Sequence, residues 1–377
     1  MKKILIIGMA DSIHTAHWVE RIISSDMVVH FFPSRKYRKV HPLLLDLESK
    51  FSNFELLQLY PTSSIAPYWN YFWDSVTKYF TNRKLQQLKK TINFNNYDFI
   101  HALELQHAGY LALDLDATTL ETTKLIVTNW GSDIYFFQNS PDHLQKLRRL
   151  LEVADRYSAE CSRDYELANQ LGFKGEFLPI IPNSFSNEEA QGKFILTSDR
   201  TQIIAKCYGE VFGLGSLVVT AVESILLENS KYNFFLYSVT RDLEETVANL
   251  AAKFPSRLKF ITVRNSLSHK ELLLEFSKSR IYLGASLSDG ISTSFLEAMT
   301  QGAFPIQTNT SCASDWLQKG CLGIAVEPNL ESILESLRIS INDDELVNKA
   351  QALNPLILEQ HTNFDILSKI AKSFYNV

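Results

Sequence analysis

The stretch IYLGASLSDGISTSFLEAMTQGAFPI, residues 281–306, decides the fold of this chain. Its first residues form a short apolar run, which is typical of a strand buried on both faces of a parallel sheet. A small polar loop follows, then a helical pattern over residues 293–300 and a second apolar run at 304–306. A strand, a helix and another strand in this order predict a βαβ unit.

The same alternation extends outward through both halves of the chain. In the first half we expect strands at 4–7, 28–32, 99–101 and 125–127, a helix from about Ser12, and a helical run over 144–171 that closes at Gly172. In the second half we expect strands at 202–205, 234–237 and 258–261, and helices at 217–228, 270–277 and from 330 onward. The pattern predicts an α/β protein of two Rossmann-like parallel-sheet domains that face each other across a ligand-binding cleft.

Two prolines mark the division between these domains. Pro179 and Pro182 are followed by a polar run to about Glu189, where we place the linker. The expected domains cover residues 1–185 and 186–360, and residues 361–377 are expected to form a C-terminal helix.

The composition excludes several classes of protein. The 377 residues are 45% hydrophobic and 21% charged, as in folded domains rather than disordered or collagen-like chains. The net charge of −5 argues against nucleic-acid binding. The apolar runs are too short for a signal peptide or a membrane span, so we expect a cytoplasmic protein. The cysteines show no zinc-like spacing, which favours reduced thiols at Cys161, Cys207, Cys312 and Cys321.

The polar loop before residue 293 has the features of a phosphate site. Unpaired N–H groups and the dipole at the start of the next helix favour an anion. Gly290 lets the backbone approach a ligand, and the hydroxyls of residues 292–294 bond phosphate oxygens or cap the helix.

Asp289 and Glu297 add two carboxylates to this loop and helix. Both can point into one cleft, where a carboxylate accepts hydroxyl hydrogen bonds from a ribose or hexose. The alternative interpretation is that Asp289 and Ser292 cap the helix and that Glu297 is solvated. Because Glu297 lies among apolar residues of the helix, the ligand-binding interpretation is favoured.

Further polar residues follow other strands of the two halves. Lys206 comes after the first strand of the second half, where it reaches a phosphate or is solvated. Gly213 and Gly215 offer backbone N–H groups before the next helix. Arg264 reaches a phosphate or lies exposed. In the first half, the residues at the expected cleft edge are Gly8, His14, His101, Trp130, Gly131 and Asp133.

Two of the first-half residues have simpler interpretations. His101 either binds substrate or is a core histidine, and Asp133 contacts substrate, orients its loop or caps a helix. The D-x-D at residues 114–116 lies between a helix and a strand, so we interpret it as a solvated loop and expect no metal site.

The two acidic residues separated by seven others resemble the signature of glycosyltransferase family 4, retaining enzymes of the GT-B fold. Asp289 stands where the family usually has its first glutamate, and Glu297 is the second. Residues 302–307, 311–313 and Trp316 extend the likeness toward a bacterial branch that builds surface polysaccharides. The resemblance is strongest over residues 281–316 and runs more weakly through nearly the whole chain.

The resemblance implies an enzyme that moves a sugar from a nucleotide-sugar donor to a saccharide acceptor, lipid-linked, in capsule, O-antigen or exopolysaccharide synthesis. It implies an N-terminal acceptor domain, a C-terminal donor domain, a final helix that packs back on the N-terminal domain, and no cofactor or metal. Glu297 would hold the ribose hydroxyls, Asp289 would touch the transferred sugar, and Lys206 would neutralise the diphosphate. The implied donor-binding residues are Gly8, Lys206, Gly213, Gly215, Arg264, Asp289, Gly290, Ile291, Ser292, Thr293 and Glu297.

The sequence departs from the family at two positions. Trp130 stands where many members have a histidine that contacts the donor sugar, which puts that contact in doubt, although an indole can stack on a sugar ring. Residues 212–216 lack the second basic residue that usually opens the next helix. These departures keep a non-catalytic nucleotide-sugar-binding scaffold as an alternative, with a GT-B nucleotide-sugar epimerase as another. A dehydrogenase is disfavoured, because no G-x-G-x-x-G follows the first strand.

Residues 67–90 combine aromatic and basic side chains. Tyr, Trp and Phe beside Lys and Arg suit the headgroup region of an anionic bilayer, which predicts contact with the inner face of the plasma membrane. The alternative is an aromatic helix packed on its own domain, and nucleic-acid stacking is disfavoured by the net charge.

Overall fold

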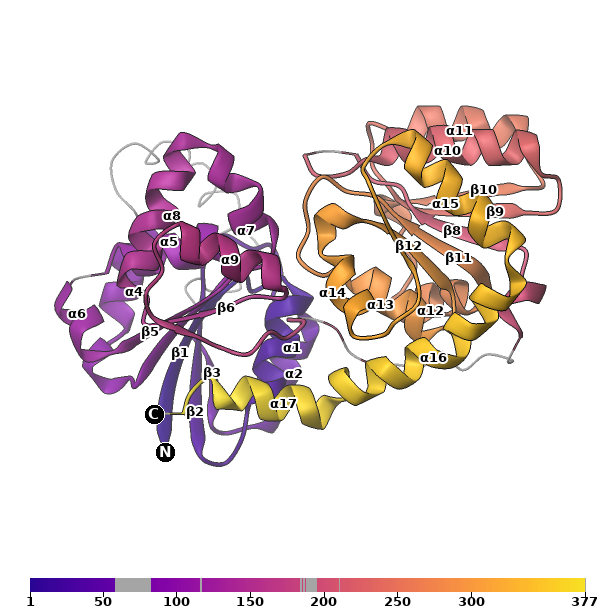
Figure 1. The fold of residues 1–377 in the computed structure, drawn as a ribbon. Helices are drawn as coiled ribbons and strands as arrows, with labels where there is room; N and C mark the ends of the chain where they lie inside the picture. The colour runs from indigo at the N-terminus through magenta and orange to yellow at the C-terminus, as the bar shows by residue number, and fades with distance from the viewer. Residues whose placement is uncertain are drawn as a thin grey trace. The chain divides into compact units, whose positions relative to one another are not determined.

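The protein folds into two compact units, seen here in a computed structural model (Figure 1). Unit 1 comprises residues 1–184 and 365–377, and unit 2 comprises residues 185–364. The structure describes residues 1–57, 83–115, 117–183, 185, 187, 195–209 and 211–376. Each unit contains one parallel sheet, as the alternating pattern predicted.

The sheet of unit 1 has the strand order β3-β2-β1-β4-β5-β6-β7, and every pair is parallel. The strands are β1 (Lys2–Gly8), β2 (Met27–Pro33), β3 (Phe54–Leu56), β4 (Phe99–Leu103), β5 (Lys124–Thr128), β6 (Arg156–Ser158) and β7 (Glu176–Phe177). The helices are α1 (Ile13–Ile22), α2 (Pro42–Lys50), α4 (Arg83–Thr91), α5 (Tyr110–Leu113), α6 (Ala117–Thr122), α7 (Ser132–Tyr135), α8 (Pro141–Val153) and α9 (Ser162–Gln170).

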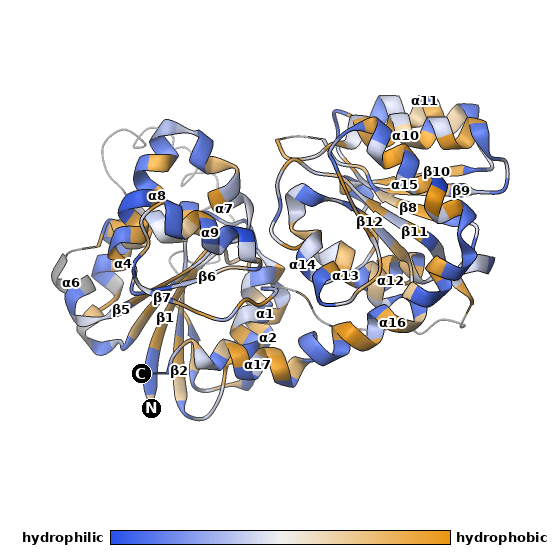
Figure 2. Ribbon diagram, in the orientation of Figure 1, coloured by the Kyte–Doolittle hydropathy of each residue, from blue (hydrophilic) through white to orange (hydrophobic). Residues whose placement is uncertain are grey.

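The central strand β1 shows why this sheet is covered on both faces. Ile4 and Ile6 pack into a core with α1, α2 and the C-terminal residues, whereas Leu5 and Ile7 pack into a second core with α4, α5 and α8. Successive strand residues point to opposite faces, so a continuous apolar run requires an apolar layer on each side. The orange strands and two-toned helices of Figure 2 follow this pattern.

Unit 2 also contains a sheet of parallel strands, with the order β10-β9-β8-β11-β12-β13. Its strands are β8 (Gln202–Lys206), β9 (Asn233–Val239), β10 (Leu258–Thr262), β11 (Ser279–Gly284), β12 (Phe304–Thr308) and β13 (Ile324–Val326). Its helices are α10 (Gly215–Glu228), α11 (Glu244–Lys253), α12 (His269–Lys278), α13 (Thr293–Thr300), α14 (Ala313–Gln318), α15 (Leu330–Asn342) and α16 (Asp344–Thr362). Helices α10, α11 and α15 share one core on this sheet, and α12 packs beside α13 (Figure 1).

The chain returns to unit 1 at its end, as the GT-B resemblance implied. Helix α17 (Phe364–Ser373) follows α16, and residues from Asp365 onward belong to unit 1. Phe374 and Tyr375 are fully buried in the core that contains α1, and the Ser368 hydroxyl donates to the Arg21 carbonyl over 2.7 Å. The last residues are therefore part of the N-terminal core.

One predicted helix is wrong. The run expected over residues 144–171 consists of α8, then the short strand β6, then α9. Strand β6 pairs with β5 and buries Tyr157 completely. Pairing with a strand distant in sequence outweighs the local helical pattern, and a strand of this length has little periodicity of its own.

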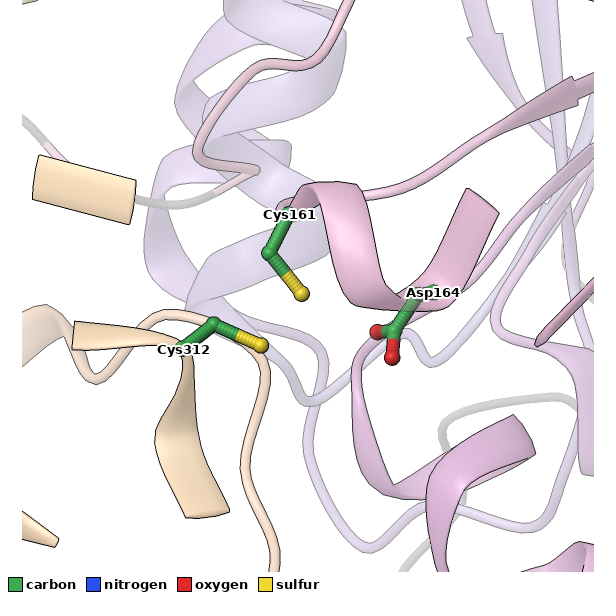
Figure 3. A group of neighbouring side chains, drawn as sticks. All are labelled: Cys161, Asp164 and Cys312. Carbon is green, nitrogen blue, oxygen red and sulfur yellow. The ribbon is translucent and has the colours of Figure 1, made fainter. Parts of the chain in front are cut away.

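The four cysteines are buried, and none of them forms a disulfide in the structure. Cys161 precedes α9 in unit 1, and Asp164 lies in the first turn of that helix; Cys312 precedes α14 in unit 2 (Figure 3).

Among the helices that the structure describes, none has the length and apolar content needed to cross a membrane.

Candidate functional site

In each unit, the strand order reverses at one place, and polar residues collect there. The reversal lies between β1 and β4 in unit 1 and between β8 and β11 in unit 2. Loops on either side of such a switch point diverge to opposite faces of the sheet, which leaves room for a ligand at the carboxyl ends of the strands. We describe the two switch points separately.

The loop after β11 is held firmly in unit 2. The Ser286 N–H donates to the Thr308 hydroxyl over 3.0 Å, and the Leu287 N–H donates to the Phe212 carbonyl over 2.7 Å. Within this loop the Asp289 carboxylate accepts the Gly290 N–H over 2.9 Å. The loop is therefore preorganised before any ligand binds.

Helix α13 begins immediately behind this loop. Its N-cap residue is Ser292, whose side chain makes no capping hydrogen bond in the described structure, and Ile291 and Ser292 are both buried. Thr293 is the first helical residue, as predicted. Helix α13 therefore begins where the sequence predicted, and the two residues before it are buried rather than solvated.

Glu297 is buried, so the interpretation that it is solvated is wrong. It is 7% exposed, and its Oε1 lies 2.7 Å from Nε2 of His269, the first residue of α12. An unpaired carboxylate would be costly at this depth, and the histidine offsets that cost. The sequence predicted Glu297 but not its partner, because His269 lies on another helix.

Lys206 is the last residue of β8 and therefore lies at the switch point. Its Nζ lies 4.8 Å from the centre of the Tyr208 ring, which gives the half-buried ammonium an aromatic face. Arg264 lies at the end of β10, in the short helical turn Val263–Asn265, and is exposed. Of the two cations that the sequence predicted to bind phosphate, Lys206 lies at the switch point of unit 2.

Gly213, just before α10, and Gly215, its first residue, do not offer the backbone N–H groups that the sequence predicted for ligand binding. The Gly213 N–H donates to the Gly209 carbonyl over 3.0 Å, and the Gly215 N–H donates to the Tyr208 carbonyl over 2.8 Å. Both N–H groups are used inside the loop. A side chain at Gly213 would collide with the Tyr208 carbonyl, so this glycine is required for close backbone packing.

At the switch point of unit 1, the structure brings two predicted residues together. The turn after Gly8 leads to Ser12, which caps α1 by accepting the His14 N–H over 3.2 Å. The His14 ring then lies 5.2 Å from the Trp130 ring, centre to centre. The Trp130 indole N–H is buried and has no hydrogen-bond partner among the described residues. This pair presents an aromatic and polar surface of the kind that sugars bind.

Asp133 orients its loop, as one of the three sequence interpretations held. Its Oδ2 accepts the N–H groups of Leu105, over 2.9 Å, and of Trp130, over 3.1 Å. Gly131 supports this geometry with a φ of 68°, which few other residues adopt. Asp133 thereby ties the loop after β5 to the turn after β4.

Glu104 is a site residue that the sequence analysis missed. It follows β4 with a φ of 86°, a strained conformation for a residue with a side chain, and is 3% exposed. Its carboxylate accepts the N–H groups of His107 and Ala108, which lie within the π-helical turn Leu105–Gly109. Only the backbone conformation reveals this role, and one glutamate at a strand end gives no sequence signal for it.

Glu104 and Asp133 act on each other electrostatically. Burial raises the pKa of both carboxyls, and the charge of Glu104 raises the pKa of Asp133 further. Arg35, which pairs with Asp11 over 3.1 Å, opposes this by lowering the pKa of Glu104. The pair therefore holds protons at a pH where ordinary carboxyls have lost them.

We expect Asp133→Asn to remove part of the pH dependence of stability. Because the folded pKa is raised, the folded protein keeps a proton that the unfolded chain releases near pH 4, so stability falls as pH rises above that value. Wild type and variant should have similar Tm at pH 4 to 5, and the wild type should lie about 4 °C lower near pH 8. Thermal melts across this range test it, with exposed Asp142→Asn as the control. Parallel curves for wild type and Asp133→Asn would contradict the assignment.

His101 is a core histidine, and the predicted substrate contact is wrong. It lies inside β4 rather than at its end and is fully buried. Nδ1 lies 2.7 Å from the Tyr375 hydroxyl, and Nε2 lies 2.6 Å from the Thr128 hydroxyl. Burial lowers its pKa to about 3, so the ring is neutral.

Two predicted features fall on residues outside the described structure. Most of the aromatic and basic stretch at 67–90 lies in residues 58–82, and Asp116 of the D-x-D is also outside. Helix α4 carries the end of the basic stretch, where Lys89 and Lys90 are exposed.

Residues 3–157 match the family model described as "Glycosyl transferase 4-like". This part of the chain, less than half of its length, is similar to the glycosyltransferase 4-like family. The matched residues cover most of unit 1 and include the switch point that holds Trp130 and Asp133. A comparison with curated protein sequences finds no match.

Solved structures share the fold of this chain over its whole length. HepE of Anabaena, crystallised with UDP and glucose, is 14% identical, with a TM-score of 0.70 and complete coverage of both chains. Sucrose-phosphate synthase from Thermosynechococcus elongatus is 12% identical, with a TM-score of 0.71 over 100% of this chain and 98% of the other. A mutant of S. aureus TarM, in complex with Fondaparinux, alpha-GlcNAc-glycerol and UDP, is 8% identical, with a TM-score of 0.72 and complete coverage of both. The chain therefore has the GT-B fold.

Proposed function

We propose that this protein is a glycosyltransferase that binds a nucleotide-sugar at the switch point of unit 2. The observation that carries the proposal is Glu297, a buried carboxylate in α13 that is held at a defined position by His269. A carboxylate oxygen accepts two hydrogen bonds, which suits the vicinal hydroxyls of a ribose. The related HepE has also been crystallised with UDP-glucose, which supports this class of donor.

The other residues of the switch point would act on the diphosphate and the sugar. Lys206, at the end of β8, would stabilise the negative charge that grows on the leaving diphosphate. Asp289 and the backbone of the loop after β11 would position the transferred sugar. No protein nucleophile is required for such a site, since positioning and charge stabilisation supply much of the rate.

The reaction we infer is a transfer with retention. The bond from the sugar's anomeric carbon to the diphosphate oxygen breaks, and a bond to the acceptor hydroxyl oxygen forms on the same face. The acceptor's proton passes to the leaving phosphate. The step balances without a redox cofactor, and Lys206 supplies a positive charge that a metal ion would otherwise provide, so we propose neither cofactor nor metal.

We place the acceptor at the switch point of unit 1. His14 and Trp130 offer ring surface for stacking, and Asp133 accepts the backbone N–H of Trp130. A saccharide, lipid-linked and destined for capsule, O-antigen or exopolysaccharide, would fit these contacts. Residues 67–90 would bring the enzyme to the inner face of the plasma membrane, where such an acceptor resides.

A thermal-shift screen of UDP-, GDP-, ADP- and CMP-sugars tests the donor site. A ligand that binds only the folded protein raises Tm by mass action. We expect one nucleotide class to raise Tm selectively and to lose that effect in Glu297→Ala. No shift with any member of the panel would contradict the proposal.

The occupied N–H groups of Gly213 and Gly215 favour a second candidate, a nucleotide-sugar-binding scaffold. With these donors used inside the loop, the leaving group depends more heavily on Lys206. Slow hydrolysis of the bound donor, or any transfer product, would exclude the scaffold.

A further inference from the structure

A histidine and a buried carboxylate meet where α12 and α13 pack together. His269 Nε2 lies 2.7 Å from Glu297 Oε1, and the histidine side chain is 45% exposed against 9% for the glutamate. The partly exposed His269 side chain therefore contacts the Glu297 carboxylate from the solvent side. Its other oxygen, Oε2, accepts no hydrogen bond from the residues that the structure describes.

The backbone that carries His269 is fixed independently of this contact. Ser268 caps α12 through a capping box, in which the Ser268 N–H donates to Glu271 Oε2 over 2.8 Å and the Ser268 hydroxyl accepts the Glu271 N–H. This arrangement satisfies the first donors of the helix and sets its direction. The imidazole therefore extends toward Glu297 from a rigid base.

A glutamate side chain has three rotatable bonds, and fixing it costs conformational entropy. A partner that holds one oxygen before the ligand arrives reduces that cost at the moment of binding. It also leaves the second oxygen, with two lone pairs, at one defined place.

We propose that His269 is a positioning residue for the donor, and that through Glu297 it makes the enzyme select ribonucleotides. His269 Nε2–H holds Oε1, while Oε2 receives the 2′ and 3′ hydroxyls of the ribose. This inference rests on the proposed donor site and goes beyond it by making recognition of the ribose hydroxyls depend on His269. It predicts that loss of His269 weakens recognition of the ribose hydroxyls and leaves the contacts to base and diphosphate unchanged.

Calorimetric titration of the full chain with two ligands tests this role. UDP and its 2′,3′-dideoxy counterpart differ only in the hydroxyls that Glu297 would bind. If a panel of UDP, GDP and ADP shows that another base is preferred, the same pair of ligands is made with that base. We expect the wild type to prefer the ribonucleotide by about tenfold or more, since hydrogen bonds to a charged group are strong. His269→Leu should lower affinity for the ribonucleotide about fivefold and leave the dideoxy ligand nearly unaffected.

Two variants separate positioning from simple destabilisation. His269→Gln retains a side-chain N–H donor of similar reach and should recover most of the preference for ribose. Ser268→Ala removes the cap of the same helix, and it should lower Tm while leaving the preference intact.

The outcomes distinguish this role from the proposed function. An unchanged ribose preference in His269→Leu, or an equal loss in Ser268→Ala, would overturn the positioning role. A wild type that binds the nucleotide without preferring ribose would overturn it as well, while leaving a nucleotide site. A wild type that binds none of the nucleoside diphosphates would overturn the proposed donor site and this inference together.

Discussion

Glu297→Gln is expected to weaken donor binding by roughly 30- to 100-fold, which corresponds to the loss of strong hydrogen bonds to a charged group. The substitution preserves side-chain volume in a buried position, so the fold should persist. An amide offers one acceptor oxygen in place of two, and the His269 contact would compete with the ribose for it. Titration calorimetry with the nucleotide-sugar found in the thermal screen measures the effect.

The control for this prediction is Glu223→Gln on α10. Glu223 forms an exposed ion pair with Lys253 over 3.0 Å, and such pairs contribute little. Its replacement should change neither Tm nor donor affinity. Unchanged affinity in Glu297→Gln, or a collapse of its Tm, would show that Glu297 is a structural residue only.

The second large effect concerns the end of the chain. We expect Phe374→Ala to destabilise unit 1 by about 3–5 kcal/mol, the usual cost of truncating a buried aromatic side chain. Phe374 is fully buried, its ring centre lies 5.1 Å from that of Trp18, and its carbonyl accepts a hydrogen bond from Arg156 over 2.7 Å. Tyr375 beside it accepts the Trp18 indole N–H over 3.1 Å.

Hydrogen–deuterium exchange read by mass spectrometry locates this destabilisation. Peptides of β1, β4 and α1 should exchange faster in Phe374→Ala, and those of unit 2 should not change. Phe364→Ala provides the control, because Phe364 is 52% exposed and its truncation should have little effect. Uniform acceleration in both units, or none in unit 1, would contradict the assignment of the C-terminal residues to the N-terminal core.

Strong local patterns in the sequence predicted the main elements correctly. The apolar run at residues 4–7 became β1, because only a central strand needs apolar residues on both faces. Helix α13 has the bounds that were expected, since Ser292 precedes it and Gly302, with a φ of 76°, follows it. Strands β3, β6, β7 and β13 were missed, because each is too short to show a period and forms through pairing with distant residues.

The same distinction applies to the site. The spacing of Asp289 and Glu297 could be read from the sequence, since a loop and the helix after it are continuous in the chain. His269 could not, because it lies 28 residues before Glu297 on a separate helix. The role of Glu104 could not be read from the sequence either, because it depends on a positive φ that the sequence does not predict. Local motifs are therefore predictable here, whereas the partners that orient them emerge only from the fold.

Whether the purified protein breaks the bond between sugar and diphosphate tests the proposed donor site most directly. Release of nucleoside diphosphate is measured from the nucleotide-sugar that raises Tm, with and without a membrane lipid extract as acceptor. We expect slow release without acceptor, faster release with it, and a rate at least about 100-fold lower in Glu297→Gln. Release that is absent under both conditions, or equal in wild type and Glu297→Gln, would contradict a donor site built on Glu297.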